Sequence, residues 1–462
     1  MRRGTSSIFA SIALVLVFLF PHAAISYSLL THEQLIDLTW RDSIVPLLLS
    51  RYPNLTAADL DQARAYAYGG CVIQDIGYYP FGDESFSDLT HYVRSGDFVV
   101  NLFRNAHNAN ELAFAIGALS HYIGDSVGHS EATNLAVPVE FPKLGAKYGH
   151  SVSYAEGKHQ HVQTEFAFDI DEVAHHRVAP LRYMRHIGIK VSMRQLALAF
   201  YQTYGLTETF AGKRRINVRD YRFATRTFIP RIAYSVTLLH RKHEPPDPTT
   251  PEFIELQKEA AETAKEENWD AYRRKAGFET YFLAGVIFIV PKIGPLHLVA
   301  VKGPTETTEA EYAHSVALSV TDLRAALQRF TPVAARYTGP APTLGSLVHP
   351  DRSSPQRRDP HHPLSNRDLD TGRVVQPGGY PLTDSTYADL LHRLVQQPTL
   401  AIPLGIKQDI QQYYSNPDLP ITTKKDADRW RQVLADLNIL AGMPTSTQLE
   451  PYPTYGDDQG DE

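Results

Sequence analysis

The sequence predicts a mainly α-helical protein, in which a multi-helical bundle carries a helical extension at its C-terminal end. Apolar residues recur at helical spacing through most of the chain, for example at Leu112, Ala115, Ile116 and Leu119, and this period is typical of one buried helix face. Almost no stretch alternates apolar and polar residues as a half-buried strand does. We therefore expect helices packed on helices, with almost no sheet.

The first 26 residues have the pattern of a secretory signal. Two arginines precede an apolar run over residues 8–20, and small residues follow it. Ala24 and Ser26 suit positions −3 and −1 of a cleavage site, so the mature chain would begin at Tyr27. The apolar run is too short for a transmembrane anchor. We expect an exported protein, extracellular or periplasmic.

Charge and cysteine content limit the possible functions further. Removing the signal leaves 43 basic against 51 acidic residues, a formal charge of −8, which argues against a broad surface for polyphosphates. Cys71 is the only cysteine, so the mature chain has no internal disulfide and depends on packing and on metal for stability. The chain has 20 histidines, and histidine is the commonest metal ligand.

The helices can be placed from their spacing and end signals. Thr56 is expected to cap a helix that begins at Ala57 and stops at Gly69 and Gly70. A loop rich in proline and glycine is expected over residues 134–150. Helical spacing predicts further helices over residues 105–123, 159–176, 184–210, 251–275, 306–330, 387–395, 406–414 and 425–440.

Residues 281–290 are strongly apolar, and a proline- and glycine-containing stretch then interrupts them. This run is too short to span a bilayer. It predicts either a buried helix or a surface that contacts lipid.

Composition divides the chain into five parts. A large helical domain over residues 27–337 follows the signal peptide, residues 1–26. Residues 338–381 are rich in Pro, Arg, Asp and His without an apolar period, as expected for a loop or linker. Residues 382–445 form the helical extension, and residues 446–462 an acidic, disordered tail.

A stripe of metal-binding residue types lies in the segment Ser120–Asn134. His121, Asp125 and His129 follow one another at intervals of four, so on an α-helix they share one face and rise about 6 Å per step. The two histidines are then about 12 Å apart along the axis, whereas a zinc–ligand bond is only about 2.0–2.2 Å long. The stripe therefore predicts more than one ion, with Asp125 as the bridge. Gly124 leaves room for another backbone or a substrate.

Further candidates precede and follow this stripe. All are nitrogen or oxygen donors, which suits zinc in an exported enzyme, and carboxylates that bridge two ions are typical of catalytic sites. Taken singly, each also has a structural interpretation, such as Asp75 as a helix cap or His91 as a surface residue. The complete set is Tyr27 as the mature N-terminus, His32, Asp75, His91, His121, Asp125, His129, His161 and Glu165.

The order His, Asp, His, HxxxDxxxH and HxxxE resembles that of the bacterial zinc-dependent phospholipase C family. The similarity covers about residues 27–168. This family shares its helical fold with the single-strand-specific zinc nucleases, and the catalytic region of eukaryotic glycosylphosphatidylinositol phospholipase D is also similar. In the family the third histidine usually follows the aspartate by six residues. Here His129 follows Asp125 by four, as in the phospholipase D-like branch.

The resemblance implies three zinc ions in a phospholipase C- and nuclease-like bundle. One ion would be held by Asp75, His91, His121 and Asp125; a second by His129, His161 and Glu165; and a third by His32, Asp125 and the free amine and carbonyl of Tyr27.

A second position also departs from the family pattern, and a third has alternatives in this sequence. The terminal residue of the family is a tryptophan, whereas here it is Tyr27, at the spacing from His32 that the nuclease branch shows. His150 and His159 are alternatives to His161, although neither has a carboxylate four residues later.

The resemblance implies an exported zinc-dependent phosphodiesterase of phospholipase C type. Zinc ions would bind the phosphodiester and lower the pKa of a water molecule, and Asp75 would orient that water or take its proton. The expected substrate is a phospholipid or a related phosphodiester, with peripheral contact to a membrane as a further expectation.

Two alternatives stay open at this point. A single-strand-specific nuclease would need aromatic side chains beside the cluster to stack bases, and the chain offers Tyr78, Tyr79, Phe81, Tyr122 and Phe166. A non-catalytic, zinc-stabilised binding module is the second alternative.

Overall fold

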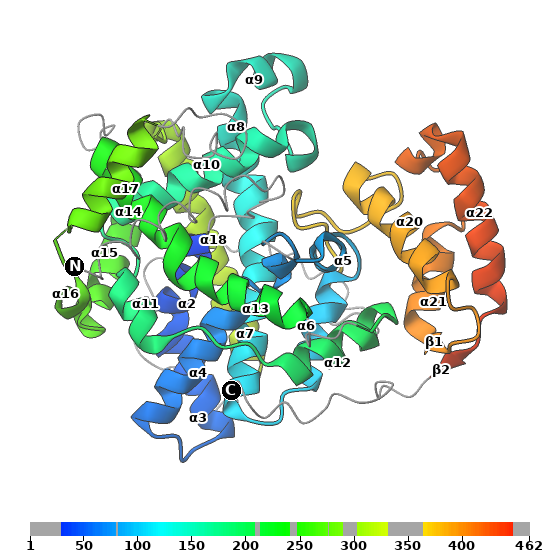
Figure 1. Ribbon diagram of the computed structural model, residues 1–462, viewed down its shortest axis with the longest axis horizontal. Coiled ribbons are helices and arrows are strands. Elements are labelled where there is room, and N and C mark those ends of the chain that lie inside the picture. Colours follow the sequence, from blue (N-terminus) through cyan, green and yellow to red (C-terminus); the bar gives the residue numbers. More distant parts are fainter. Residues whose placement is uncertain are drawn as a thin grey trace, which may run out of the picture.

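The computed structural model describes residues 29–79, 82–207, 213–240, 247–275, 277–289, 303–330 and 364–446. Helices make up nearly all of the regular structure in these ranges (Figure 1). The strands described are β1 and β2, which pair in parallel over two residues each. The prediction of a mainly α-helical protein is confirmed.

The helices of the N-terminal two thirds pack into one large bundle (Figure 1). In chain order they are α2 (Leu29–Thr39), η1 (Trp40–Ile44), α3 (Val45–Arg51), α4 (Ala57–Gly70), η2 (Ile73–Gly77), α5 (Glu84–Tyr92), α6 (Ser95–Arg104), α7 (Ala109–Gly128), η3 (His129–Thr133), α8 (Asn134–Glu140), α9 (Pro142–Tyr148), α10 (Tyr154–Ala174), α11 (Leu181–Ile187), α12 (Met193–Tyr204), α13 (Lys213–Phe223), η4 (Ala224–Phe228), α14 (Ile229–His240), α15 (Pro251–Glu266), α16 (Trp269–Tyr272), α17 (Phe278–Ile289) and α18 (Glu306–Phe330).

The C-terminal extension gathers on one side of this bundle (Figure 1). Its elements are α20 (Pro381–Val395), β1 (Ile402–Pro403), α21 (Leu404–Tyr413), η8 (Thr422–Lys425), α22 (Ala427–Gly442) and β2 (Thr445–Ser446). α20 packs against α22 and also against α5 of the bundle, and α21 contacts α12. The predicted helical extension is therefore present and docked.

The long helix α7 is the centre of the bundle. It packs against α4, α6, α18 and α2, and nearly all of its residues from Ala113 to Asp125 are buried. Its approach to α4 is close because Gly117 has no side chain: a Cβ there would collide with the backbone oxygen of Ala67. This crossing brings the C-terminal end of α4 beside the second half of α7, where the metal-binding stripe lies.

Local signals placed several helices correctly. Thr56 caps α4 through its side chain, which accepts from the backbone N–H of Asp59, and the carboxylate of Asp59 accepts in return from the Thr56 backbone. The predicted helix over residues 306–330 is α18. The other predicted helices are present with shifted ends, and two are divided: residues 184–210 into α11 and α12, and residues 251–275 into α15 and α16.

The prediction of a loop over residues 134–150 is wrong. This segment forms the helices α8 and α9. Pro142 occupies the first turn of α9, where the missing N–H of proline has no intrahelical partner to lose. Ala136 and Val137 of α8 are fully buried, and that burial stabilises a helix whose sequence contains residues that usually break one.

The other predicted segments are described only in part or not at all. The signal peptide, residues 1–26, and residues 447–462 of the predicted tail lie outside them. Part of the expected linker, residues 364–380, is described, and it packs against the bundle instead of leading away from it. Among the described helices, none combines the length and the apolar character that crossing a membrane requires.

Candidate metal centre

The stripe on α7 meets side chains from four other elements. His121 and Asp125 lie in the last two turns of α7, and His129 is the first residue of the π-helical turn η3 that follows. His32 comes from α2, Asp75 from the short turn η2, His91 from the last turn of α5, and His161 and Glu165 from α10. The structure therefore brings together eight of the nine predicted residues. Tyr27 lies outside the described residues.

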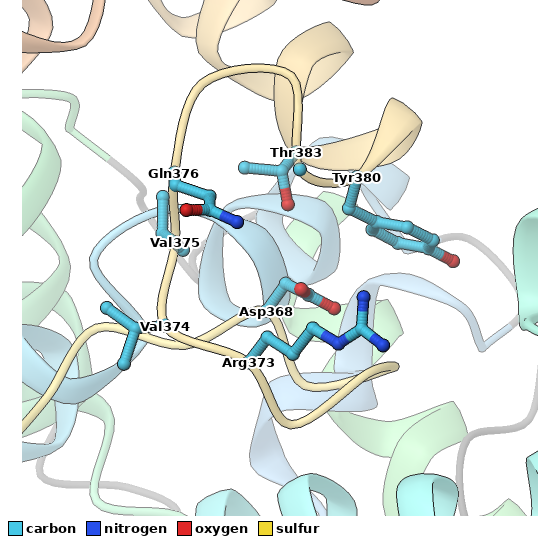
Figure 2. A pocket seen from close by; sticks show the side chains of 8 residues that line it. Asp368, Arg373, Val374, Val375, Gln376, Tyr380 and Thr383 are labelled. Atoms are coloured by element: carbon cyan, nitrogen blue, oxygen red, sulfur yellow. The ribbon is translucent and has the colours of Figure 1, made fainter.

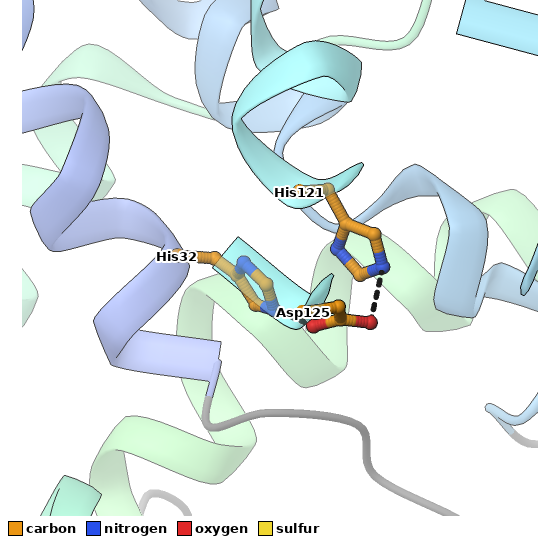
Figure 3. Close-up of side chains that lie close together, drawn as sticks. All are labelled: His32, His121 and Asp125. Carbon is orange, nitrogen blue, oxygen red and sulfur yellow. Dashed lines mark ion pairs between the residues drawn. The ribbon is translucent and has the colours of Figure 1, made fainter. Parts of the chain in front are cut away.

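Asp125 lies between two groups of histidines. One carboxylate oxygen, Oδ1, is 3.1 Å from Nε2 of His32. The other, Oδ2, is 3.1 Å from Nε2 of His121 and 3.3 Å from Nε2 of His91. His32 and His121 stack with ring centroids 4.3 Å apart, and both face Asp125 (Figure 3). A carboxylate that presents its two oxygens to different sets of nitrogens has the geometry of a bridge between two ions.

Gly124 explains how α2 comes so near to this carboxylate. A Cβ at Gly124 would lie 2.9 Å from Cδ1 of Leu35 and 3.2 Å from Nδ1 of His32. The space expected at this glycine is thus filled by two side chains of α2, not by a backbone or a substrate.

A second group forms around Asp75. Its Oδ1 atom is 3.2 Å from Nε2 of His91 and 4.0 Å from Nε2 of His121, and the two Nε2 atoms are 3.4 Å apart. This carboxylate oxygen is buried and makes no hydrogen bond within the described residues. Asp75 is therefore not a helix cap, and His91, with 2% exposure, is not a surface residue.

A third group is formed by His129, His161 and Glu165. Oε1 of Glu165 is 3.1 Å from Nε2 of His129 and 2.9 Å from Nε2 of His161. Neither carboxylate oxygen of Glu165 and neither ring nitrogen of His161 makes a hydrogen bond of good geometry with the described residues. The alternatives His150 and His159 are both exposed, whereas His161 is 1% exposed.

Three of the histidines are oriented in the same way. Nδ1 of His91 is 2.7 Å from the carbonyl oxygen of Ser87, that of His121 is 3.0 Å from the carbonyl of Cys71, and that of His129 is 3.1 Å from the carbonyl of Leu369. A carbonyl only accepts, so Nδ1 must carry the proton, and the lone pair is left on Nε2. Each Nε2 points into the cluster, as required of a ligand.

Burial controls the charge of the cluster. It lowers the pKa of His161 to about 4 and raises the pKa of Glu165 to about 8. For Asp125, burial acts to raise the pKa, but the adjacent His121 and His129 lower it well below its usual range. A neutral His161 beside buried carboxylates forms a donor set whose charge a divalent cation would neutralise.

The donor chemistry fits zinc. Nitrogen and carboxylate oxygen donors of three groups lie close enough to share an ion in each: His32, His121 and Asp125; Asp75, His91 and His121; and His129, His161 and Glu165. Cys71 is buried, and its thiol faces the carbonyl of Tyr68, so no thiolate joins them. Buried donor atoms of Asp75, His161 and Glu165 have no hydrogen-bond partner in the described residues, as expected where the partner is a metal.

A fourth acidic group has another explanation. Asp171, His175 and Glu309 also lie close together, but the guanidinium of Arg177 forms ion pairs with Asp171, Glu172 and Glu309. The cation that these carboxylates need is therefore already present as a side chain, and we assign no metal to them.

Sequence reasoning missed two residues of the centre, Leu369 and Asp370. Leu369 supplies the carbonyl at His129, and Oδ1 of Asp370 is 3.6 Å from Nδ1 of the same histidine. Both lie in the segment expected to be a linker. The Leu369 contact leaves no trace in residue type, because any residue can supply a carbonyl.

A small pocket opens beside these residues, between the segment 368–376 and the start of α20 (Figure 2). Asp368, Arg373 and Tyr380 are among the residues that line it, and its volume of about 10 Å³ is about the space of one water molecule. It is too small to be a phospholipid site.

Comparison with known proteins gives one match. Residues 31–209 match the family model described as zinc dependent phospholipase C. Comparison with curated proteins and with solved structures gave no match. The matched segment contains all eight residues of the cluster, and it confirms the resemblance read from the order of those residues. Over residues 31–209, this chain is therefore similar to the zinc-dependent phospholipase C family.

Proposed function

We propose that this protein is an exported zinc-dependent phosphodiesterase that hydrolyses a phospholipid or a related phosphodiester. The observation that carries the proposal is the position of Asp125 between His32 on one side and His91 and His121 on the other. Together with the group His129, His161 and Glu165, it provides places for about three ions. Zinc at these places would bind the phosphodiester oxygens and lower the pKa of a water molecule.

The assignment of ligands follows the three groups of the cluster. Asp75, His91, His121 and Asp125 would hold one ion, and His129, His161 and Glu165 a second. His32 and Asp125 would hold the third together with the free amine of Tyr27.

We assign to Asp75 the role of orienting the attacking water or of accepting its proton. Its Oδ1 atom is held 3.2 Å from Nε2 of His91, is buried, and makes no hydrogen bond within the described residues. A carboxylate oxygen placed in this way is available to orient a water molecule or to accept its proton.

The burial of the aromatic side chains near the cluster supports a lipid substrate over a nucleic acid. A nuclease needs rings that are open to stacking with bases. Tyr78, Tyr79, Tyr122 and Phe166 are all buried; Tyr122 donates its hydroxyl to the carbonyl of Ser365, and Tyr79 packs edge-on against Tyr221. Phe81 lies outside the described residues. The described rings therefore serve packing.

Contact with a membrane surface is supported by α17. Phe278, Tyr281 and Phe282 are 85%, 59% and 41% exposed on this helix, and the opposite face, with Ala284 and Ile287 buried, belongs to the side that packs on α14. The exposed Arg274 and Lys275 come directly before it. Exposed aromatic rings beside basic residues suit a phospholipid surface, with the rings among acyl chains and the cations at phosphates.

The decisive experiment is a parallel assay. Mature protein purified without chelator is tested against phosphatidylcholine, a glycosylphosphatidylinositol and single-stranded DNA, with Asp125→Asn as the inactive control. We expect release of a phosphorylated head group from a lipid and no cleavage of DNA. Cleavage of DNA alone would support the nuclease, and zinc binding without turnover of any substrate would support a binding module. N-terminal sequencing of the secreted protein tests export.

A further inference from the structure

A short segment that precedes the C-terminal extension docks on the metal centre. We name residues 364–375 the strap. Its ends are joined by backbone pairing between Arg367 and Val374 and by the N–H of Val375 to the carbonyl of Asn366. The turn between them reaches across α5, α7 and η3 and buries Leu369 completely. The strap lies far along the chain from the segment that matches the family.

Hydrogen bonds attach the N-terminal end of the strap to the bundle. Tyr122 of α7 donates to the carbonyl of Ser365 at 2.7 Å, and Ser95 of α6 donates to the carbonyl of Arg367 at 2.6 Å. The N–H of Asp97 donates to the side chain of Asn366 at 3.0 Å. These contacts fix where the strap turns, and the turn is what approaches the metal centre.

At the turn, Leu369 contacts two of the predicted ligand residues through its backbone. Its N–H donates to the carbonyl of His91 at 3.1 Å, and its carbonyl accepts from Nδ1 of His129 at 3.1 Å. The equivalent carbonyls for the rings of His91 and His121, from Ser87 and Cys71, belong to the bundle itself. Of these three rings, His129 alone takes its orienting carbonyl from the strap.

Asp370 strengthens this arrangement electrostatically. Its carboxylate accepts from the hydroxyls of Tyr380 at 2.6 Å and Tyr92 at 3.1 Å, which hold Oδ1 3.6 Å from Nδ1 of His129. Its carbonyl accepts from the side chain of Asn134 at 2.7 Å. A carboxylate on the Nδ1 side of a ligating imidazole orients the ring and strengthens the binding of a metal at Nε2.

We propose that the strap is a working part of the metal centre: it positions His129 as a ligand, so the ion shared with His161 and Glu165 depends on the strap. The inference rests on the proposed zinc centre. Leu369 and Asp370 are positioning residues, since they act through His129. Docking of the strap would thus complete the site.

Gly372 offers a way to displace the strap without touching a ligand. Its φ angle of +65° is one that glycine adopts and other residues disfavour. A Cβ at this position would also collide with the backbone oxygen of Ser126 on α7. Gly372→Ala should therefore lift the turn from α7.

Gly378 provides the matched control. It has a φ angle of +78°, and its added Cβ would lie 2.9 Å from Pro420. Gly378→Ala thus imposes a similar backbone strain outside the strap, against the extension instead of against α7.

The test measures zinc content and zinc affinity of the full-length mature protein, by elemental analysis and by competition with a chelator, with far-UV circular dichroism to follow folding. For Gly372→Ala we expect one ion to bind about 10- to 100-fold more weakly, with the other ions and the helical content retained. Gly378→Ala should bind as the wild type does. Asp370→Asn, which keeps the side-chain shape, should weaken the same ion even if Gly372→Ala does not fold.

The outcomes separate the two proposals. If the wild type holds about three zinc ions and both Gly372→Ala and Asp370→Asn hold them with unchanged affinity, the role of the strap is wrong while the zinc centre stands. If Gly372→Ala does not fold, unchanged affinity in Asp370→Asn alone overturns the inference. If the wild type itself holds less than one ion, the proposed zinc centre fails first, and the inference with it.

Discussion

The carboxylate of Asp125 faces Nε2 of His32 at 3.1 Å, although the two residues come from different helices, α7 and α2. The other oxygen of Asp125 faces His121 at the same distance. This two-sided contact makes Asp125 the proposed bridge between two metal positions, and it leads to the first prediction.

Asp125→Asn should remove phosphodiesterase activity more completely than His129→Ala. The amide keeps the shape but removes the charge shared by two ions, whereas His129 belongs to one. Replacing a residue that hydrogen-bonds to a metal ligand typically lowers metal affinity or activity about 10- to 100-fold. Replacing the bridging ligand itself should therefore lower kcat/KM by more than about 100-fold. His159→Ala, an exposed histidine on α10, is the control and should be active. Equal and modest losses in the first two variants would show that the bridge is misassigned.

The mature protein should contain close to three zinc ions per chain, as elemental analysis of protein purified without chelator will measure. Asp75, Asp125 and Glu165 are at most 1% exposed, and buried carboxylates need a neutralising partner. A content of one ion or less would exclude the trinuclear arrangement.

Removal of the metal should lower the melting temperature. An ion held at 100 times its Kd stabilises the folded state by about 2.7 kcal/mol, and this chain has no disulfide to compensate because Cys71 is its only cysteine. Differential scanning calorimetry before and after thorough chelation measures the change. An unchanged melting temperature would mean that the cluster binds no structurally coupled metal.

Cleavage of the signal peptide before Tyr27 should complete the third ion position. Asp169 accepts from the backbone N–H of Leu30 at 3.0 Å, which fixes the first turn of α2 and so the origin of the segment ahead of it. A free α-amine titrates near pH ~7.7–8.0, so a metal competes with its proton only slightly at neutral pH. A protein that begins Met-Tyr27 should hold about one zinc fewer and be much less active.

N-terminal sequencing of the exported protein is the control for that experiment, because another cleavage point would remove its premise. If cleavage before Tyr27 is confirmed and the extended form has full activity and the same zinc content, the terminal amine is not a ligand, and His32 needs another partner.

Replacing Phe278 and Phe282 together by alanine should weaken binding to phospholipid vesicles about tenfold or more. Full burial of one phenylalanine side chain contributes about 1.5–3 kcal/mol, and the double variant loses both rings. Cosedimentation with vesicles that contain anionic lipid measures it. Hydrolysis of a dispersed short-chain substrate should be unchanged. Ile254→Ala, at a 56% exposed position on α15, is the matched control. Equal vesicle binding by all three proteins would exclude α17 as the contact.

The sequence by itself determined the features that depend on local spacing. The cap at Thr56, the extent of α18 and the placing of His121 and Asp125 on one buried stripe of α7 follow from periods and end signals within a few residues. The order of the predicted ligands was also enough to indicate the family, because each ligand type must occur for the chemistry to be possible.

The prediction from local residue spacing is wrong where burial in the tertiary structure outweighs local preferences. Residues 134–150 contain prolines and glycines that usually end helices, yet Ala136 and Val137 are buried and the segment is helical. Packing free energy from the rest of the bundle, absent from any local window, decided that segment.

Only the tertiary structure decided how the metal centre is completed. The tautomer of His129 depends on the carbonyl of Leu369, 240 residues later, and the position of Asp370 depends on hydroxyls from Tyr92 and Tyr380. A backbone carbonyl has no signature in residue type, and a segment without apolar period is predicted as a linker. The strap contributes through its position in the folded chain, because the orientation of an imidazole ring depends on which atoms lie beside it in space.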